Sequence, residues 1–197
     1  MSIVSRALRA AMALAVVAVL AGCAHPINVG TDTAPPRVEA SLIQKKVAYT
    51  MTDAQRALQA ITAGGGGDRI SYYPYRDLEK SIRDALRAVY QDVVVLKSAA
   101  DAGAVQASGA SLVFTPEIKT DSGSPSPFTW PPTYFTSEVS CVVTDPAGAE
   151  ITRVKASGRG EAEFSEFKGE FGLSAKRAAT KMSAALSSEI LKNEKLR

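Results

Sequence analysis

Two stretches of the chain carry apolar residues at helical spacing. From about Tyr75 to Tyr90 they recur every three or four residues and form one stripe: Leu78, Ile82, Ala85, Leu86, Val89 and Tyr90. From about Leu173 to Lys192 the stripe consists of Ala175, Ala179, Met182, Leu186 and Ile190. We therefore predict two long amphipathic helices. The second is rich in alanine, so it can approach a sheet closely.

Shorter apolar stretches predict strands. Alternating or continuous apolar residues mark the segments 46–51, 69–73, 92–96 and 111–118. In the last of these, Pro116 indicates an edge position or a bulge, because proline has no N–H for the ladder. A short helix is expected over 54–61, and a turn or weak helix over 98–109.

The next two strands form a predicted hairpin. Tyr134–Thr144 and Ala149–Phe164 flank the turn-forming tetrad Asp145–Gly148. Gly158 and Gly160, inside the second strand, indicate a bulge or a strong twist.

The order of elements predicts the fold class. Two amphipathic helices each need an apolar surface, and one face of a sheet supplies it. We therefore predict an α+β fold with two layers: a mostly antiparallel sheet with two long amphipathic helices on one face. Residues 39–197 are expected to form this single domain.

Two stretches interrupt the pattern. Gly64–Gly67 predicts a flexible loop, and a phosphate-binding function is not indicated because no Lys-Ser/Thr follows it. Residues 121–133 read DSGSPSPFTWPPT, and their four prolines exclude regular structure.

The proline-rich stretch is followed closely by aromatic residues. Its possible partner-binding residues are Phe128, Trp130, Tyr134 and Phe135. Aromatic side chains on stiff loops are common binding anchors, which predicts that this segment faces a partner. The alternative is that Phe128 and Trp130 fold back and cover an open end of the sheet.

The N-terminus follows a different pattern. Residues 1–9 carry two arginines and no acid, and residues 10–21 form an apolar run too short to span a bilayer. This run ends in Leu20-Ala21-Gly22-Cys23. We predict a signal peptide over residues 1–22. The alternative is an ordinary secretory signal in which the cysteine occurs by chance.

The segment Leu20-Ala21-Gly22-Cys23 resembles the lipobox of bacterial lipoproteins at all four positions. The resemblance implies cleavage before Cys23, a diacylglycerol on its thiol and an N-acyl chain such as palmitate, which together anchor a protein stably in a membrane. In Gram-negative lipoproteins an aspartate after the cysteine usually marks the inner membrane, and here that residue is Ala24. The resemblance therefore implies a lipid anchor in the outer membrane, with the domain facing the periplasm.

Residues 23–38 are expected to be the acylated cysteine and a flexible tether. Residues 24–38 hold three prolines, one glycine and few apolar side chains. His25 lies in this tether without a companion ligand for a metal, so we expect it to be solvated.

The body of the chain resembles small periplasmic lipoproteins of the LPS-assembly lipoprotein and YajG type. The resemblance rests on the element order over about Val47 to Leu191 behind the lipobox. The stretch Tyr73–Glu79 also looks like uncharacterised proteobacterial lipoproteins. The family fold implies two helices on one face of a sheet, and binding or assembly work.

Composition removes several classes of function. The chain has 197 residues and a net charge of +3, which is too small to indicate nucleic-acid binding. One histidine and two cysteines supply no metal or haem site, so we expect no metal and no cofactor. Cys141, in a predicted strand, is expected to be a buried, inert thiol.

Three functions remain to be compared. The first is a non-enzymatic binding or assembly module of the cell envelope, held to the membrane through Cys23 and contacting an envelope protein. The alternative is a periplasmic hydrolase acting on cell-wall or lipid substrate, for which Glu161, Glu163 and Glu166 are the available carboxylates. A third is lipid or lipopolysaccharide handling, which the small net charge does not favour. We expect the first, without enzymatic activity.

Overall fold

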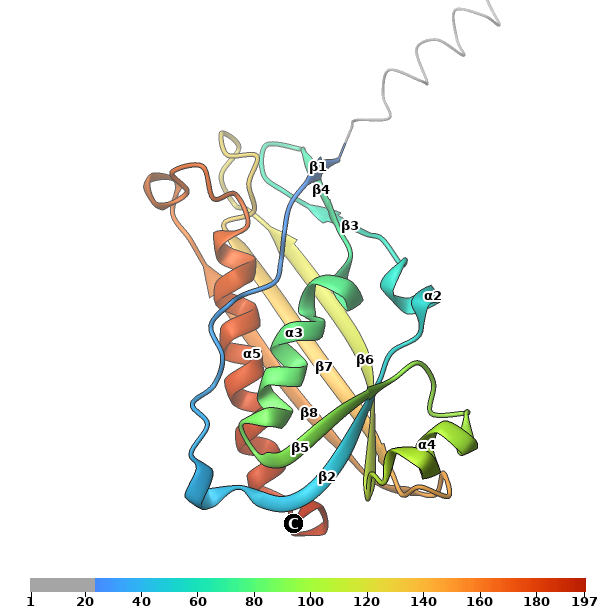
Figure 1. The fold of residues 1–197 in the computed structure, drawn as a ribbon. Helices are drawn as coiled ribbons and strands as arrows, with labels where there is room; N and C mark the ends of the chain where they lie inside the picture. The colour runs from blue at the N-terminus through green and yellow to red at the C-terminus, as the bar shows by residue number, and fades with distance from the viewer. Residues whose placement is uncertain (1–23) are drawn as a thin grey trace, which may run out of the picture.

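The computed structural model describes residues 24–197; the predicted signal peptide and Cys23 lie outside the described residues. A five-stranded sheet in the order β5-β2-β6-β7-β8 forms one layer (Figure 1). Its strands are β2 (Ile43–Thr50), β5 (Tyr90–Leu96), β6 (Leu112–Gly123), β7 (Tyr134–Thr144) and β8 (Glu150–Glu161). A smaller sheet, in the order β1-β4-β3, contains β1 (His25–Pro26), β3 (Ala60–Ala63) and β4 (Arg69–Tyr72).

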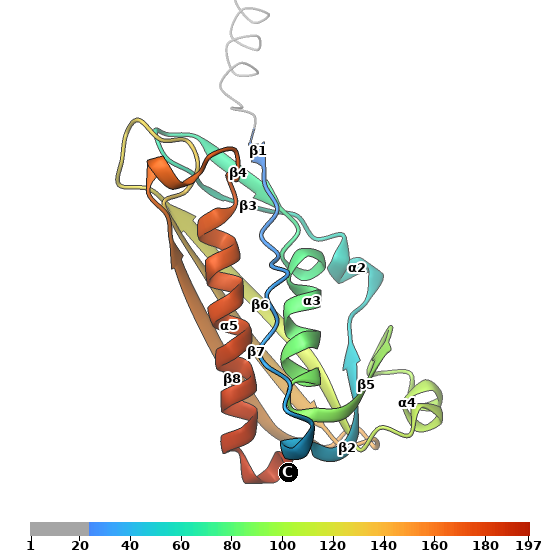
Figure 2. The ribbon, with the colours of Figure 1, turned by 60° about the vertical axis from the view of Figure 1, so that its left-hand side comes forward.

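Two long helices form the second layer. Helices α3 (Pro74–Arg87) and α5 (Leu173–Lys192) lie side by side on one face of the large sheet (Figures 1 and 2). The shorter helices are α2 (Asp53–Arg56), α4 (Ala102–Ser108) and the 3-10 turns η1 (Glu39–Ser41), η2 (Phe164–Glu166) and η3 (Glu194–Leu196). Within residues 24–197, no helix is both long and apolar enough to cross a membrane. The predicted α+β fold with both long helices on one face is confirmed.

The large sheet is mixed in direction. Its two longest ladders, β6-β7 and β7-β8, are antiparallel, and the first of them runs in unbroken register from Val113↔Thr144 to Gly123↔Tyr134. Strand β2 pairs in parallel with both β5 and β6. Parallel neighbours need crossover connections, and α3 and α4 lie in those connections. The sheet is thus antiparallel over most of its length, with a parallel side that the sequence did not predict.

The core lies between the sheet and the two helices. Every residue of the two predicted apolar stripes is buried. They pack against large buried side chains from the strands: Tyr49, Tyr72, Tyr90, Phe114 and Phe135. The two helices contact each other through small residues, and the Ser183 hydroxyl donates a hydrogen bond to the backbone oxygen of Ser81 (2.7 Å).

Gly158 and Gly160 do not mark a bulge, which was one of the two alternatives predicted for them. The β7-β8 ladder keeps its register past both residues, and its irregularity lies at Val143/Thr144. A Cβ on Gly158 would lie 2.1 Å from the backbone oxygen of Ala178, and one on Gly160 would lie 1.9 Å from that of Ser174. Glycine is present because the backbone of α5 lies directly on β8.

Two predicted boundaries also differ. The helix expected over 54–61 ends at Arg56, and Ala60–Ala63 forms β3 instead, paired with β4. Residues 121–123, expected to be irregular, extend β6 and pair with β7. Pro116 lies two residues beyond the last β2-β6 pair, where β6 has no strand partner on that side, as an edge position requires.

Residues 27–38, predicted to be part of a flexible tether, run between α3 and α5 in Figure 2; we call them the strap. Val29 is fully buried in the core. The Thr180 hydroxyl of α5 donates a hydrogen bond to the Thr31 hydroxyl (3.0 Å), and the Arg37 guanidinium donates one to the backbone oxygen of Tyr90 (3.0 Å). These contacts correct the predicted tether: the strap is part of the packed structure.

Candidate interaction surface

One end of the molecule is built from loops, and β1 lies among them (Figure 1). We call it the loop end; it comprises residues 24–26, 64–68, 124–133 and 163–172. The hairpin turn 145–148 and the C-terminus lie at the opposite end. The predicted partner-binding residues come from the loop end or from the adjoining start of β7.

The tetraglycine loop packs against the proline-rich loop. The backbone N–H of Gly65 donates a hydrogen bond to the carbonyl oxygen of Trp130 (2.9 Å). A Cβ on Gly64 would lie 2.3 Å from that oxygen, and one on Gly65 would lie 1.7 Å from the carbonyl oxygen of Thr129. Glycine is required here because two backbones approach closely. The loop predicted to be flexible is therefore fixed to its neighbour.

Hydrogen bonds inside the proline-rich loop fix its shape. The Ser124 hydroxyl accepts from the N–H of Ser126 (3.1 Å), and the Ser126 hydroxyl accepts from the N–H of Phe128 (3.3 Å). At the other side of the loop, the buried Ser174 hydroxyl of α5 donates to the backbone oxygen of Pro132 (2.7 Å). The loop thus presents Phe128 on a shaped backbone that is tied to the first turn of α5.

Trp130 joins three segments of the loop end. Its ring lies 4.3 Å from that of His25 and 4.6 Å from that of Phe171, centroid to centroid. It is partly buried and packs against the main core. His25 also lies near Asp68, with Nε2 3.8 Å from Oδ1. The His25 side chain thus contacts Trp130 on one side and is still 43% exposed, so the expected solvation holds only in part.

The aromatic side chains farthest from the core are phenylalanines. The side chain of Phe128 is 92% exposed and that of Phe164, in η2, is 73% exposed. Phe171 is exposed on one side while the other contacts Trp130. The loop end therefore combines a packed base with apolar tips that no described residue covers.

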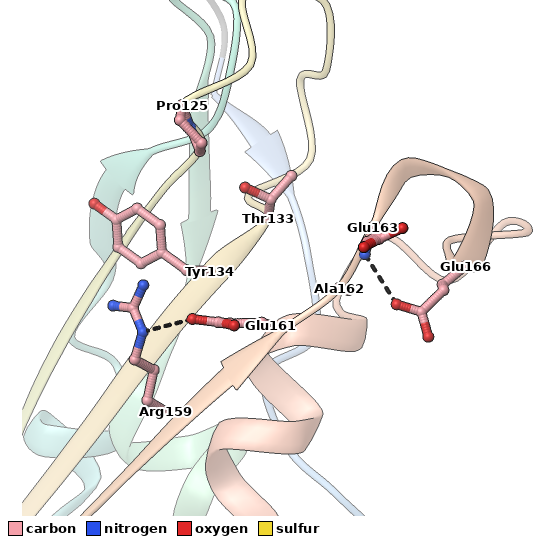
Figure 3. A pocket seen from close by; sticks show the side chains of 8 residues that line it. All are labelled: Pro125, Thr133, Tyr134, Arg159, Glu161, Ala162, Glu163 and Glu166. Carbon is pink, nitrogen blue, oxygen red and sulfur yellow. Dashed lines mark hydrogen bonds and ion pairs between the residues drawn. The ribbon is translucent and has the colours of Figure 1, made fainter.

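A hollow of about 440 Å³ lies beside the loop end, on the sheet face opposite the helices (Figure 3). Tyr134 and Arg159 form its floor, with the guanidinium 4.5 Å from the centre of the tyrosine ring. Arg159 also forms an ion pair with Glu161 at 3.0 Å. Pro125 and Thr133 lie above them in Figure 3. The hollow is open and four of its lining side chains are charged, whereas small-molecule sites are mostly apolar and enclosed.

The carboxylates considered for hydrolysis line this hollow. Glu161 pairs with Arg159, and Glu166 pairs with Arg177 at 2.8 Å. The hydrogen bonds from Arg177 and from the backbone N–H of Glu163 lower the pKa of Glu166 to about 2. A general acid in a glycosidase needs a raised pKa, so the shift at Glu166 is opposite to the one that this role requires.

The four predicted partner-binding residues separate into different environments. Phe135 is fully buried in the core, so it cannot be a surface anchor, which corrects that assignment. Trp130 packs against the core and supports the loop, as the fold-back alternative expected. Phe128 is exposed at the loop tip, and Tyr134 forms the floor of the hollow.

Other residues of this surface were missed. The sequence places Phe164 at the end of the predicted strand Ala149–Phe164, and nothing in its pattern singles out Phe171 or Arg159. The spacing Phe164-x-x-Phe167-x-x-x-Phe171, broken by Gly169, could have indicated a loop with alternately buried and exposed aromatics, because Phe167 is buried.

Cys141 is buried and unpaired in β7, as predicted. Burial raises the pKa of its thiol to about 12, so it is protonated at neutral pH. Among residues 24–197, no group of three or more histidine, cysteine, aspartate or glutamate side chains is arranged to hold a metal ion.

No protein-family model and no curated protein matches this chain. Among solved structures, it is similar to a Xanthomonas campestris protein assigned to the family DUF330, with 9% identity, a TM-score of 0.50, and coverage of 85% of this chain and 93% of that one. It also matches a dodecameric PelC from Paraburkholderia phytofirmans (14% identity, TM-score 0.40, 79% and 94% covered). A candidate lipoprotein from Caulobacter crescentus matches at 14% identity and a TM-score of 0.27, with 72% and 88% covered. The first match shows a shared fold.

Proposed function

We propose that the protein is a lipid-anchored, non-enzymatic binding module of the bacterial cell envelope, with Cys23 as the acylated residue. The observation that carries the proposal is the position of β1. The N–H of Ile27 donates to the backbone oxygen of Ser71 (3.0 Å), so the fold begins within a few residues of Cys23. An anchor at this position holds the domain at the membrane in a fixed orientation, which suits assembly work. We further propose the outer membrane, facing the periplasm, because Ala24 follows the cysteine.

The hollow at Tyr134 and Arg159 is the proposed contact for an envelope protein. Tyrosine and arginine are enriched among residues that dominate binding energy at protein interfaces. Their ring–guanidinium contact holds both side chains in place before binding, which reduces the entropy lost on association. The lowered pKa of Glu166 and the ion pairs around it support a binding surface over a hydrolytic site.

Metabolic labelling tests the anchor. Wild-type cells grown with a radioactive fatty acid should yield labelled protein that sediments with the membranes. Cys23→Ser should carry no label and should leave the membrane fraction. Equal labelling of the two proteins would refute lipidation at Cys23.

Photo-crosslinking in intact cells tests the partner contact. Benzoylphenylalanine at position 134 should give one discrete protein adduct. Position 142 is the matched control, because Val142 lies on the same face of β7 eight residues away, about 27 Å at strand rise. Arg159→Glu should remove the adduct from position 134. The same adducts from both positions, or an adduct that survives Arg159→Glu, would refute the hollow as the contact.

A further inference from the structure

We propose that the loop end lies against the lipid bilayer and inserts Phe128 and Phe164 between the lipid headgroups. The proposal rests on the proposed acylation of Cys23 and adds a second, non-covalent membrane contact made by the folded domain itself.

The first argument is the exposure of the two side chains. Phe128 is 92% and Phe164 73% exposed, although phenylalanine is usually buried in folded proteins. They belong to two separate loops, and both loops lie at the same end of the molecule (Figures 1 and 2). Pro125 and Pro127 precede Phe128, and because proline lacks a backbone N–H donor they keep this part of the loop out of a helix or a strand. Rigid loops with exposed apolar tips can enter a bilayer surface with little loss of conformational entropy.

The second argument is the place where the described chain begins. Ala24 directly precedes β1, which pairs with β4 at the loop end. Consecutive Cα atoms are about 3.8 Å apart, so a lipid on Cys23 holds this end of the domain, and not the opposite end, at the membrane. His25, two residues after Cys23, packs on Trp130. Trp130 lies in the same loop as Phe128, so the start of the chain is held beside the loop that carries Phe128.

Charge decides how the contact is made. The acids of loop 163–172 are largely compensated by α5: Glu166 pairs with Arg177, and Glu170 pairs with Lys176. Among the residues of the loop end, Lys168 is the single lysine or arginine, beside four acidic residues. Attraction to anionic lipids therefore contributes little, and burial of the phenylalanine rings is the driving force. The contact should form on zwitterionic lipid and should resist salt.

The fluorescence of Trp130, the single tryptophan of the chain, reports this contact directly. The lipidated full-length mature protein is reconstituted into phosphatidylcholine vesicles, in which some lipids carry a nitroxide quencher on the acyl chain near the glycerol. We expect quenching of Trp130 in the wild type, unchanged by high salt. Phe128→Ser combined with Phe164→Ser should reduce the quenching at least twofold. Leu191→Ser is the matched control, because it removes an exposed apolar side chain at the far end of α5 and should leave quenching unchanged.

Each outcome separates the membrane contact from the anchor. Quenching that is equal in the double variant and the wild type would refute insertion of the two phenylalanines. Protein that floats with the vesicles but shows no quenching would refute the orientation while leaving the anchor intact. Protein that fails to float would refute the proposed acylation. In cells, benzoylphenylalanine at position 128 should crosslink to lipid, and an adduct to a protein at that position would overturn the proposal.

Discussion

Glycine at positions 158 and 160 determines how closely α5 lies on β8. Cβ atoms at these positions would meet backbone atoms of α5, which cannot move without shifting the whole helix. The alanines of α5 serve the same contact from the other side, since Ala175, Ala178 and Ala179 are all fully buried. The absence of side chains at Gly158 and Gly160 thus allows the short distance between α5 and β8.

Gly160→Ala should therefore destabilise the fold by about 3 kcal/mol or more, because the new methyl group overlaps the backbone of Ser174 and Ala178. Gly103→Ala is the control. It lies in α4, where a Cβ meets nothing closer than 3.5 Å, so the helix should gain up to about 1 kcal/mol. Urea unfolding of the chain from Ala24 measures both. A loss of less than 1 kcal/mol in Gly160→Ala would contradict the close packing.

The buried thiol of Cys141 makes the free energy of unfolding fall as pH rises through the alkaline range. Burial raises the pKa of its thiol to about 12, whereas an unfolded thiol titrates near 8.5–9. The unfolded state releases this proton first, so the stabilisation is complete below about pH 8.5 and is lost as pH rises towards 12. The contribution of this thiol to the slope is about −1 kcal/mol per pH unit between pH 9 and 10. Burial also raises the pKa of Tyr49, Tyr72 and Tyr90 above the unperturbed value of about 10, so these residues steepen the loss of stability from about pH 9 upward.

Cys141→Ala isolates this contribution. The variant should lose stability at neutral pH, because a small cavity replaces the sulfur, but its free energy of unfolding should fall less steeply than that of the wild type between pH 9 and 10, by about 1 kcal/mol per pH unit. Urea unfolding at several pH values measures both slopes. A parallel fall in the two proteins would show that the thiol titrates normally in the folded state.

At the scale of elements, the strap belongs to no helix or strand, yet it is held in place by contacts with α3, α5 and β5. Val29 enters the core, and Arg37 reaches the backbone oxygens of Arg87, Tyr90 and Gln91 at the C-terminal end of α3 and the start of β5. A cation there also interacts favourably with the helix dipole. The strap covers the line along which the two long helices meet.

A chain that begins at Val38 should consequently be less stable than one that begins at Ala24. The loss of Val29 burial alone accounts for about 1.5–3 kcal/mol. Both chains should unfold in one cooperative transition, which thermal and urea melts followed by circular dichroism can compare. Val29→Ser in the longer chain should reproduce much of the loss. Equal midpoints for the two chains would show that the strap contributes no net stability.

The elements that the sequence predicts well are those whose pattern is set by burial on one face. Both helical stripes and the β7-β8 hairpin follow from periodicity and turn residues alone. The strap, the short strand β3 and the parallel side of the sheet could not be predicted, because their partners lie far away in sequence and their own residues carry no period. The candidate site could likewise be predicted only in part. The aromatic residues within 128–135 are evident from the sequence, but tertiary packing determines that Phe135 is buried and Phe128 is exposed.

At the scale of the whole molecule, the two ends differ in character. The loop end carries exposed phenylalanines and the first described residues, whereas the opposite end carries the C-terminus and a hairpin turn closed by Asp145. Between them, the outer positions of β7 and β8 are mostly polar and face solvent, as antiparallel sheets allow, whereas α4 covers Ala48 and Val113 on the outer face of β2 and β6. A domain held at the membrane by its loop end would present this face and the far end to the periplasm.

A linker inserted between Cys23 and Ala24 tests whether anchor and loop end act together. A Gly/Ser linker of about 20 residues has a root-mean-square reach of about 25 Å, enough to release the domain from the surface while keeping it tethered. In the wild-type background, nitroxide quenching of Trp130 should persist, because the tether keeps the loop end at high local concentration and the two phenylalanines still insert. In the Phe128→Ser, Phe164→Ser background, the same linker should abolish the quenching that the short connection alone maintains. Equal quenching of the two linker proteins would show that the phenylalanines do not hold the domain at the bilayer.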